Sequence, residues 1–136
     1  MRNLQRSVRV DVAQLECFAR RALERVRTIQ RTPQTTLQKI DSVAIVLVGK
    51  RRMVDLHRRF LGRRGATDVL TFDHGEIVIA PDVARGQARR FGTSLGRELR
   101  LYIVHGLLHL HGFDDKEPSD IRKMRAAEIK VLRASL

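Results

Sequence analysis

The segment from Ser94 to His111 is the most constraining feature of this 136-residue chain. Its apolar residues recur at helical spacing, and in its second half they surround the helix almost completely. A helix that is apolar on nearly every side is stable only when other elements cover each of its faces. The sequence therefore predicts a buried helix over residues 94–111, around which the rest of the chain packs.

The remaining elements are read from shorter patterns. Strands are predicted at 7–10, 43–48, 68–72 and 76–80, and helices at 12–26, 50–60, 81–91 and from Glu117 onward, with a loop at 32–36. The run 43–48 is continuously apolar, which is typical of a central strand buried on both faces. Asp73-His74-Gly75 predicts an antiparallel hairpin between the last two strands.

The order of these elements predicts the fold class. Strand–helix–strand units favour parallel pairing, and the hairpin adds an antiparallel strand. We therefore expect one α/β domain over residues 1–136, with a small mixed sheet of about four strands packed with helices. A chain of this length can bury a core without disulfides or structural metals.

Two histidines lie four residues apart in the predicted central helix. Helical spacing places the side chains of His105 and His109 on one face, where both imidazoles can bind a single metal ion. Gly112 is suited to end the helix, because glycine readily adopts the left-handed conformation found at helix C-termini. The chain can then turn back and supply a third ligand from residues 113–115.

The sequence leaves three candidates for that third ligand. Asp115 ranks first because it lies beyond the predicted turn, and Asp114 ranks second because it can instead stabilise the turn or orient an imidazole. His111 ranks third, since it lies about 200° around the helix axis from His109. Two histidines and one oxygen ligand leave a coordination position open, which is typical of a catalytic metal site.

Gly106 separates this motif from that of the zinc peptidases. Those enzymes carry His-Glu-x-x-His, in which the glutamate is the general base. Here a glycine occupies the position of that glutamate. A peptidase of this class would lack its proton acceptor, so peptide hydrolysis is disfavoured.

The composition indicates the partner and the compartment. Lys and Arg total 27 against 15 Asp and Glu, and this formal net charge of +12 favours a polyanionic partner, nucleic acid first. No stretch reaches the ~20 apolar residues of a membrane span, arginines interrupt any signal-peptide pattern, and the single Cys17 cannot form an internal disulfide. We expect a cytoplasmic protein without a membrane partner. The lack of Trp argues against a binder built on rows of stacked aromatic rings.

Three motifs follow one another along the chain. Residues 67–72 read Thr-Asp-Val-Leu-Thr-Phe, residues 75–79 read Gly-Glu-Ile-Val-Ile, and residues 105–114 read His-Gly-Leu-Leu-His-Leu-His-Gly-Phe-Asp. They resemble the Thr-Asp-Val-Leu-Ser-Phe, Gly-Asp-Ile-Val-Ile and His-Gly-x-Leu-His-Leu-x-Gly-aromatic-Asp-His motifs of the YbeY family, the metal-dependent endoribonucleases of bacterial ribosomal RNA maturation. The resemblance covers residues 43 to the end, and the order of elements extends it toward the N-terminus.

The resemblance implies a single α/β domain with a zincin-like metal helix, one zinc ion (Zn²⁺) and cleavage of single-stranded RNA. It also implies 3′-end processing of small-subunit ribosomal RNA and ribosome quality control. The partners would be ribosomal RNA and ribosomal particles, without DNA; the oligomeric state is left open. Carried onto this chain, the metal ligands would be His105, His109 and, at the position of the family's third histidine, Asp115.

Two positions depart from the family pattern. Asp115 replaces the usual third histidine, and a carboxylate ligand would lower the net charge of the loaded site from +2 to +1. Leu61 occupies a position where family members commonly carry an arginine. Four arginines surround that position: Arg58, Arg59, Arg63 and Arg64. We favour Arg59 as the catalytic substitute, and we read the cluster as phosphate contacts.

Other questions stay open at the level of sequence. His57 is interpreted as a surface helix residue and His74 as a turn residue, and neither is assigned a role. RNA cleavage can proceed by a metal-activated water or by attack of the 2′-hydroxyl, and the sequence does not choose between them. The alternative functions are a non-catalytic, metal-stabilised ribosome-assembly factor that binds RNA, and a metallohydrolase acting on another substrate class, which Gly106 and the charge disfavour.

Overall fold

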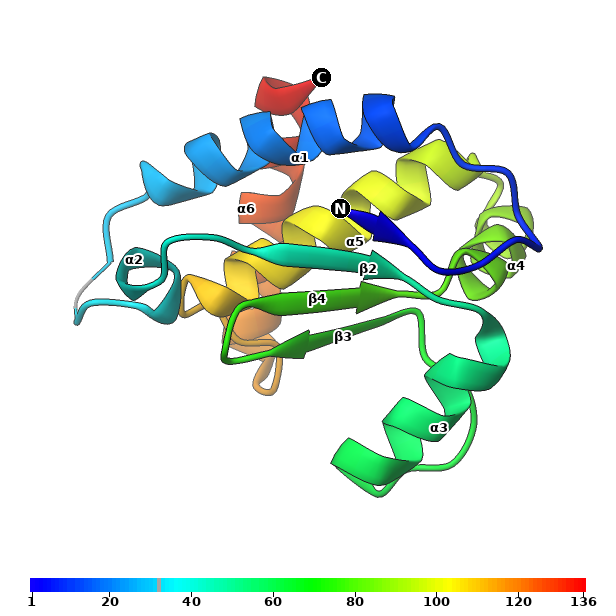
Figure 1. The fold of residues 1–136 in the computed structure, drawn as a ribbon. Helices are drawn as coiled ribbons and strands as arrows, with labels where there is room; N and C mark the ends of the chain where they lie inside the picture. Colours follow the sequence, from blue (N-terminus) through cyan, green and yellow to red (C-terminus); the bar gives the residue numbers. More distant parts are fainter. Residues whose placement is uncertain (32) are drawn as a thin grey trace.

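A mixed sheet with helices on both faces organises the chain, as Figure 1 shows. The structure is a computed structural model that describes residues 1–31 and 33–136. Within these residues the elements are β1 (Arg2–Asn3), α1 (Val12–Arg27), α2 (Thr36–Lys39), β2 (Ala44–Leu47), α3 (Lys50–Leu61), β3 (Val69–Phe72), β4 (Glu76–Ile79), α4 (Pro81–Phe91), α5 (Leu95–Leu110) and α6 (Pro118–Ser135).

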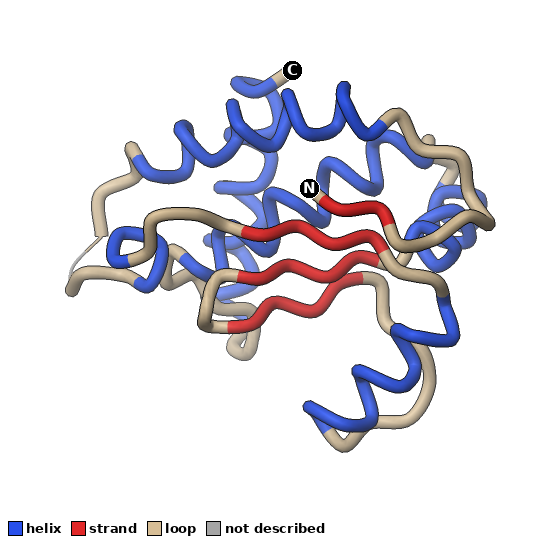
Figure 2. Tube along the Cα trace, viewed as in Figure 1, coloured by secondary structure: helices blue, strands red, loops and turns tan. Residues whose placement is uncertain are grey.

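The sheet combines parallel and antiparallel pairing. Its strands lie in the order β1-β2-β4-β3 (Figure 2). β2 pairs in parallel with β1 and with β4, whereas β3 and β4 form the antiparallel hairpin. The expected α/β class, with a small mixed sheet of four strands that includes one hairpin, is confirmed.

The central strands separate two hydrophobic clusters. On one face, Ile45 and Ile77 join the main core, which also contains residues of α1, α5 and α6. On the other face, Val46 and Val78 join a smaller cluster that contains Met53 of α3. Neighbouring residues of one strand point to opposite faces, so an uninterrupted apolar run is what burial on both faces requires.

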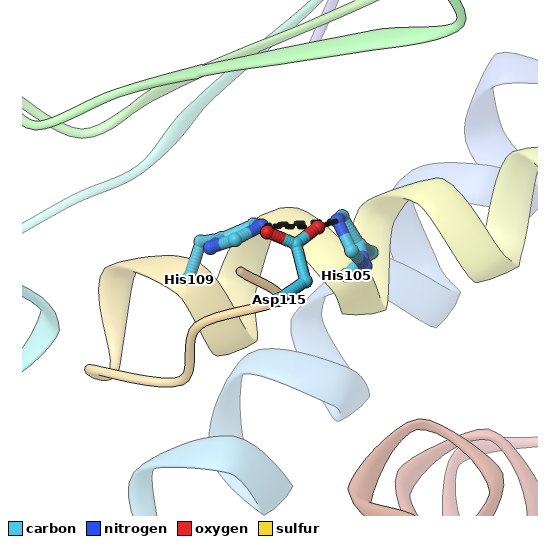
Figure 3. A group of neighbouring side chains, drawn as sticks. All are labelled: His105, His109 and Asp115. Atoms are coloured by element: carbon cyan, nitrogen blue, oxygen red, sulfur yellow. Dashed lines mark hydrogen bonds and ion pairs between the residues drawn. The ribbon is translucent and has the colours of Figure 1, made fainter. Parts of the chain in front are cut away.

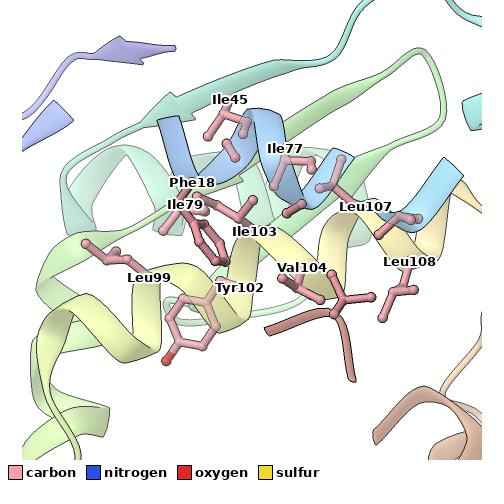
Figure 4. Packing of buried hydrophobic residues seen from close by; sticks show 14 of the residues in the cluster. Phe18, Ile45, Ile77, Ile79, Leu99, Tyr102, Ile103, Val104, Leu107 and Leu108 are labelled. Atoms are coloured by element: carbon pink, nitrogen blue, oxygen red, sulfur yellow. The ribbon is translucent and has the colours of Figure 1, made fainter. Parts of the chain in front are cut away.

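Helix α5 occupies the centre of the main core, between the sheet and the helices α1 and α6 (Figures 1 and 4). Ile103 and Leu107 of α5 are buried against the sheet together with Phe18 of α1. The prediction that the apolar 94–111 segment forms a buried helix is confirmed over Leu95–Leu110, and the side chain of Ser94 caps its N-terminus by accepting from the Arg97 N–H at 3.1 Å.

Gly106 is the point at which α5 comes closest to strand β4. A Cβ atom at this position would lie 2.8–3.0 Å from three side-chain carbons of Ile77, which is itself fully buried. The missing side chain therefore lets the helix backbone approach the sheet closely. This contact fixes the height of the helix above β4, one residue away from His105.

The first strand is not where the sequence predicted it. The expected strand at 7–10 is wrong, because β1 is Arg2–Asn3, paired with Val46 and Leu47. The Gln5 side chain accepts from the Val8 N–H at 2.9 Å and donates to the Val8 carbonyl at 2.8 Å. The backbone groups of Val8 are thus satisfied by a side chain, and this closes a turn where a strand was expected.

The loop expected at 32–36 needs correction at its end. Thr32 lies outside the described residues, and Thr36 is already the first residue of α2. Thr35 caps this short helix, since its hydroxyl accepts from the Gln38 N–H at 3.3 Å while the Gln38 side chain accepts from the Thr35 N–H at 2.7 Å. The reciprocal pair is a capping box, whose Thr-x-x-Gln spacing is legible in the sequence.

The tight contact at Gly106 leads to a stability prediction. We expect Gly106→Ala to lower the free energy of unfolding by about 1–3 kcal/mol, because overpacking against buried Ile77 outweighs the gain in helix propensity. Gly86→Ala in the middle of α4 is the matched control: a Cβ there meets no heavy atom within 4 Å, so we expect a gain of about 0.5–1 kcal/mol. Urea denaturation measures both changes, and equal shifts of the same sign would contradict the close approach.

Candidate metal centre

The C-terminus of α5 is a hydrogen-bonded reversal of the chain. Gly112 adopts a left-handed conformation with φ +88°. Its N–H donates to the His109 carbonyl at 3.0 Å, and the Phe113 N–H donates to the Leu108 carbonyl at 3.0 Å. These two bonds form a Schellman motif, in which glycine is favoured because other residues are strained at positive φ. The expected helix stop at Gly112 is confirmed.

The reversed chain brings Asp115 back beside the helix (Figure 3). Its carboxylate Oδ2 lies 3.5 Å from the Nε2 atom of His105 and 3.5 Å from the Nε2 atom of His109. The two Nε2 atoms are 3.0 Å apart. Ligand atoms about 2.0–2.1 Å from a tetrahedral zinc ion are separated by roughly 3.3–3.4 Å, so the spacing of these three atoms fits a single ion.

The opposite nitrogen of each imidazole faces an oxygen atom. The Nδ1 atom of His109 is 3.0 Å from the Phe113 carbonyl, to which a protonated Nδ1 donates. The Nδ1 atom of His105 is 3.6 Å from Oε1 of Glu128, a buried carboxylate on α6. The Phe113 carbonyl keeps the proton of His109 on Nδ1 and leaves the Nε2 lone pair free to bind a cation, and the Glu128 carboxylate faces the corresponding nitrogen of His105. Both rings are thus oriented for metal binding.

The structure places Asp115, and neither of the other two candidates, beside both imidazoles. The Asp114 carboxylate accepts from the Asp115 N–H at 2.7 Å and so supports the turn. His111 is fully buried on another side of the helix end, where its ring nitrogens lie 3.0 Å from the Thr35 hydroxyl and 2.7 Å from the Ile29 carbonyl.

Arg31 secures the same turn from the segment that follows α1. Its guanidinium donates to the carbonyls of His111 at 3.1 Å and Gly112 at 2.7 Å. It also lies over the ring of Phe113, 4.2 Å from the ring centroid. The two carbonyls that directly follow α5 are therefore satisfied by a cation that also packs on an aromatic face. The turn that carries Asp115 is held from outside the helix.

The three candidate ligands open onto a cavity of about 540 Å³. One wall is formed by the end of α3 and the following loop, and another by β3, the edge strand of the sheet. A second cavity of about 280 Å³ adjoins the first, and both include Asp68, His105 and Asp115 in their walls. A substrate therefore has access to the point at which the three ligand atoms meet.

The arginines near the cavity are arranged differently from the sequence expectation. Arg59 is an exposed residue of α3 whose guanidinium lies 3.8 Å from the Asp55 carboxylate, and it does not line the cavity. Arg63, in the loop after α3, does line it. The arginine side chain is long and flexible, so the sequence alone does not show which arginine of this segment lines the cavity.

Two further histidines, His57 and His74, lie outside the group of candidate ligands. His57, interpreted from sequence as a plain surface residue, lines the cavity, and its Nδ1 lies 3.0 Å from the Gly65 carbonyl. His74 lies in the hairpin turn as expected and stacks on the ring of Phe72, with centroids 5.7 Å apart. Neither has a ligand atom within the group formed by His105, His109 and Asp115.

Tyr102 lines the second cavity from α5. Burial raises the pKa of its phenol, and the nearby carboxylates of Asp68 and Glu98 raise it further. Its hydroxyl oxygen is buried and has no hydrogen-bond partner among the described residues. Tyr102 therefore stays protonated at neutral pH.

None of the helices in the described part of the chain has the length and apolar character that crossing a membrane requires.

Comparison with known proteins adds independent evidence. The family model described as Endoribonuclease YbeY matches residues 1–135. The Endoribonuclease YbeY of Frankia alni is 34% identical over 143 residues, covering 90% of this chain and 74% of that protein. The Endoribonuclease YbeY of Beutenbergia cavernae is 35% identical over 142 residues, covering 92% of this chain and 89% of that protein.

A solved structure shares the fold. The solution structure of TM1509 from Thermotoga maritima matches with a TM-score of 0.62 and 24% sequence identity, covering 98% of this chain and 87% of that one. At this identity the likeness concerns the fold alone. The family model, however, extends over nearly the whole chain, and its relatives are more than 30% identical. The chain belongs to the Endoribonuclease YbeY family.

Proposed function

We propose that this chain is a zinc-dependent endoribonuclease that cleaves single-stranded RNA. The observation that carries the proposal is the group formed by His105, His109 and Asp115, whose ligand atoms converge at the wall of an open cavity. The names of the relatives support an RNA substrate, and so does the formal net charge of +12.

A finer role is proposed from the family resemblance of the three motifs at 67–72, 75–79 and 105–114. We propose that the enzyme acts in the cytoplasm on ribosomal RNA and ribosomal particles. It matures the 3′ end of small-subunit ribosomal RNA and takes part in ribosome quality control. A single domain over residues 1–136 both recognises and cleaves the RNA.

The donor set suits zinc, which binds imidazole nitrogen and carboxylate oxygen and commonly keeps one position open in catalytic sites. A bound cation would supply Lewis acidity toward a phosphodiester. Within the chain, the Phe113 carbonyl and Glu128 orient the imidazoles. We propose that Arg63 contacts the substrate phosphate, since it lines the cavity; Arg59 is the alternative, after release from Asp55.

The first test separates cleavage from binding. We expect His109→Ala to abolish cleavage of a labelled single-stranded RNA in the presence of zinc, because one of three ligands is lost. The affinity for the same RNA should stay within a few-fold of wild type and fall steeply with salt in both proteins, since phosphate contacts dominate binding. Denaturing gels measure cleavage, and fluorescence anisotropy measures binding. If wild type cleaves no RNA with any divalent metal, the non-catalytic assembly factor is the better description.

The second test concerns the third ligand. We expect Asp115→Ala to lower zinc affinity by at least about 100-fold, because a direct ligand is removed. Asp114→Ala is the matched control: its carboxylate bonds to the backbone of Asp115, so its loss should lower affinity by no more than about 10-fold. Competition with a chromogenic chelator measures both affinities. An equal loss in the two variants would remove Asp115 from the ligand set.

The third test concerns Glu128, which the sequence analysis did not single out. We expect Glu128→Gln to lower zinc affinity by about 10–100-fold, because the carboxylate facing His105 Nδ1 is replaced by a neutral amide. Glu117→Gln, at the exposed start of α6, should leave zinc affinity unchanged. The same chelator competition is the measurement, and retained affinity in Glu128→Gln would show that this carboxylate does not orient the ring.

A further inference from the structure

Three rings distant in sequence meet beside the cavity. Phe60 lies in the last turn of α3, Phe72 is the last residue of β3, and His74 lies in the hairpin turn. The Phe60 and Phe72 centroids are 5.3 Å apart in an edge-on arrangement, and the Phe72 and His74 centroids are 5.7 Å apart in a stacked one. We call these three residues the ring cluster; Phe60 and Phe72 also line the cavity that contains His105, His109 and Asp115.

Phe60 is held in place while most of its ring stays in contact with solvent. It is 58% exposed, whereas Phe72, which supports it, packs partly into the smaller hydrophobic cluster. Figure 1 shows that α3 stands off the edge strand β3. The residues at the end of α3, Phe60 and Leu61, are exposed and line the cavity. An aromatic face is thus presented to whatever enters the cavity.

The charge of α3 and of the loop that follows it indicates the chemistry of that occupant. Residues 50–64 contain seven Lys and Arg residues and one acidic residue, Asp55. Arg58 and Arg59 pair with Asp55, and no other ion pair is found for this segment within residues 1–31 and 33–136. Arg63 lines the same cavity as Phe60. An exposed ring next to unpaired cations is how proteins hold unpaired nucleotides, with the base on the ring and the phosphate on the cation.

We propose that Phe60, supported by Phe72 and His74, is a stacking platform for one unpaired base of the RNA substrate. The inference rests on the proposed endoribonuclease function and deepens it. Stacking on Phe60 holds one nucleotide at the α3 wall, and the backbone that continues from it crosses the cavity toward His105 and His109. A base in a duplex is already stacked on its neighbours, so the platform selects single strands.

Phe91 provides a matched control for Phe60. It is 64% exposed and also follows an arginine, Arg90, whose guanidinium lies 5.5 Å from its ring centroid. The corresponding distance from Arg59 to the Phe60 centroid is 6.0 Å. Phe91 ends α4 and does not line the cavity. The two residues therefore match in type, exposure and neighbour, and differ in their place relative to the candidate metal centre.

The test combines a protein variant with a change in the RNA. The probes are 2′-O-methyl RNA strands of about eight nucleotides, in the size range of single-strand sites, either intact or with one abasic position moved along the strand. Anisotropy gives the Kd for wild type, Phe60→Ala, Phe60→Tyr and Phe91→Ala. We expect Phe60→Ala to weaken binding of the intact strand about 10-fold, with Phe60→Tyr and Phe91→Ala within a few-fold of wild type. One abasic position should weaken binding by wild type to the same extent and leave Phe60→Ala unaffected.

The outcomes separate this inference from the function on which it rests. If wild type cleaves unmodified single-stranded RNA while Phe60→Ala binds the intact strand like wild type, the platform is wrong and the nuclease stands. If Phe60→Ala and every abasic position weaken binding additively, the ring contacts something other than a base, and the platform is again wrong. If wild type neither binds nor cleaves RNA, the proposed function and the platform both fail.

Discussion

The packing of α5 is the constraint on which the candidate metal centre depends. The helix contacts β3 and β4 on one side and α1, α4 and α6 on the others, so neither its height nor its rotation can change without disturbing the main core. Within that enclosure His105 and His109 keep only about a quarter of their side-chain surface in contact with solvent. Their rings are therefore oriented by a rigid element before any cation arrives, which is the arrangement that a precise metal site needs.

The third candidate ligand depends on a different set of interactions. Asp115 lies on a turn, and its side chain is 46% exposed. The turn is fixed from outside the helix, by Arg31 on two carbonyls and on the Phe113 ring, and by buried His111, which links the helix end to the segments around Ile29 and Thr35. His111 thus contributes to the centre by building the turn, which explains a third histidine in the motif that faces away from the other two.

The helices and strands whose apolar residues recur at a regular spacing could be predicted, because that spacing shows which face of the element is buried. The helix Pro81–Phe91 and the hairpin strands follow from it, whereas the two-residue strand β1 is too short to have a period and was misplaced. In the candidate site, His105, His109 and Asp115 lie within one helix and its turn. That they lie close together could therefore be predicted from the local geometry of the chain. Glu128 and Phe60 come from other elements, and only the packing of α6 and α3 brings them near.

The close approach at Gly106 also limits which reactions this architecture can acquire. The glutamate of a zinc peptidase would place its Cβ within 3.0 Å of the Ile77 side chain, in space that is already filled. Lifting α5 to make room would break the packing of the helix against the sheet, which forms part of the main core. The packing that holds α5 against β4 is thus incompatible with a peptidase base at this position, and a single mutation cannot convert one hydrolytic chemistry into the other without rebuilding the helix–sheet interface.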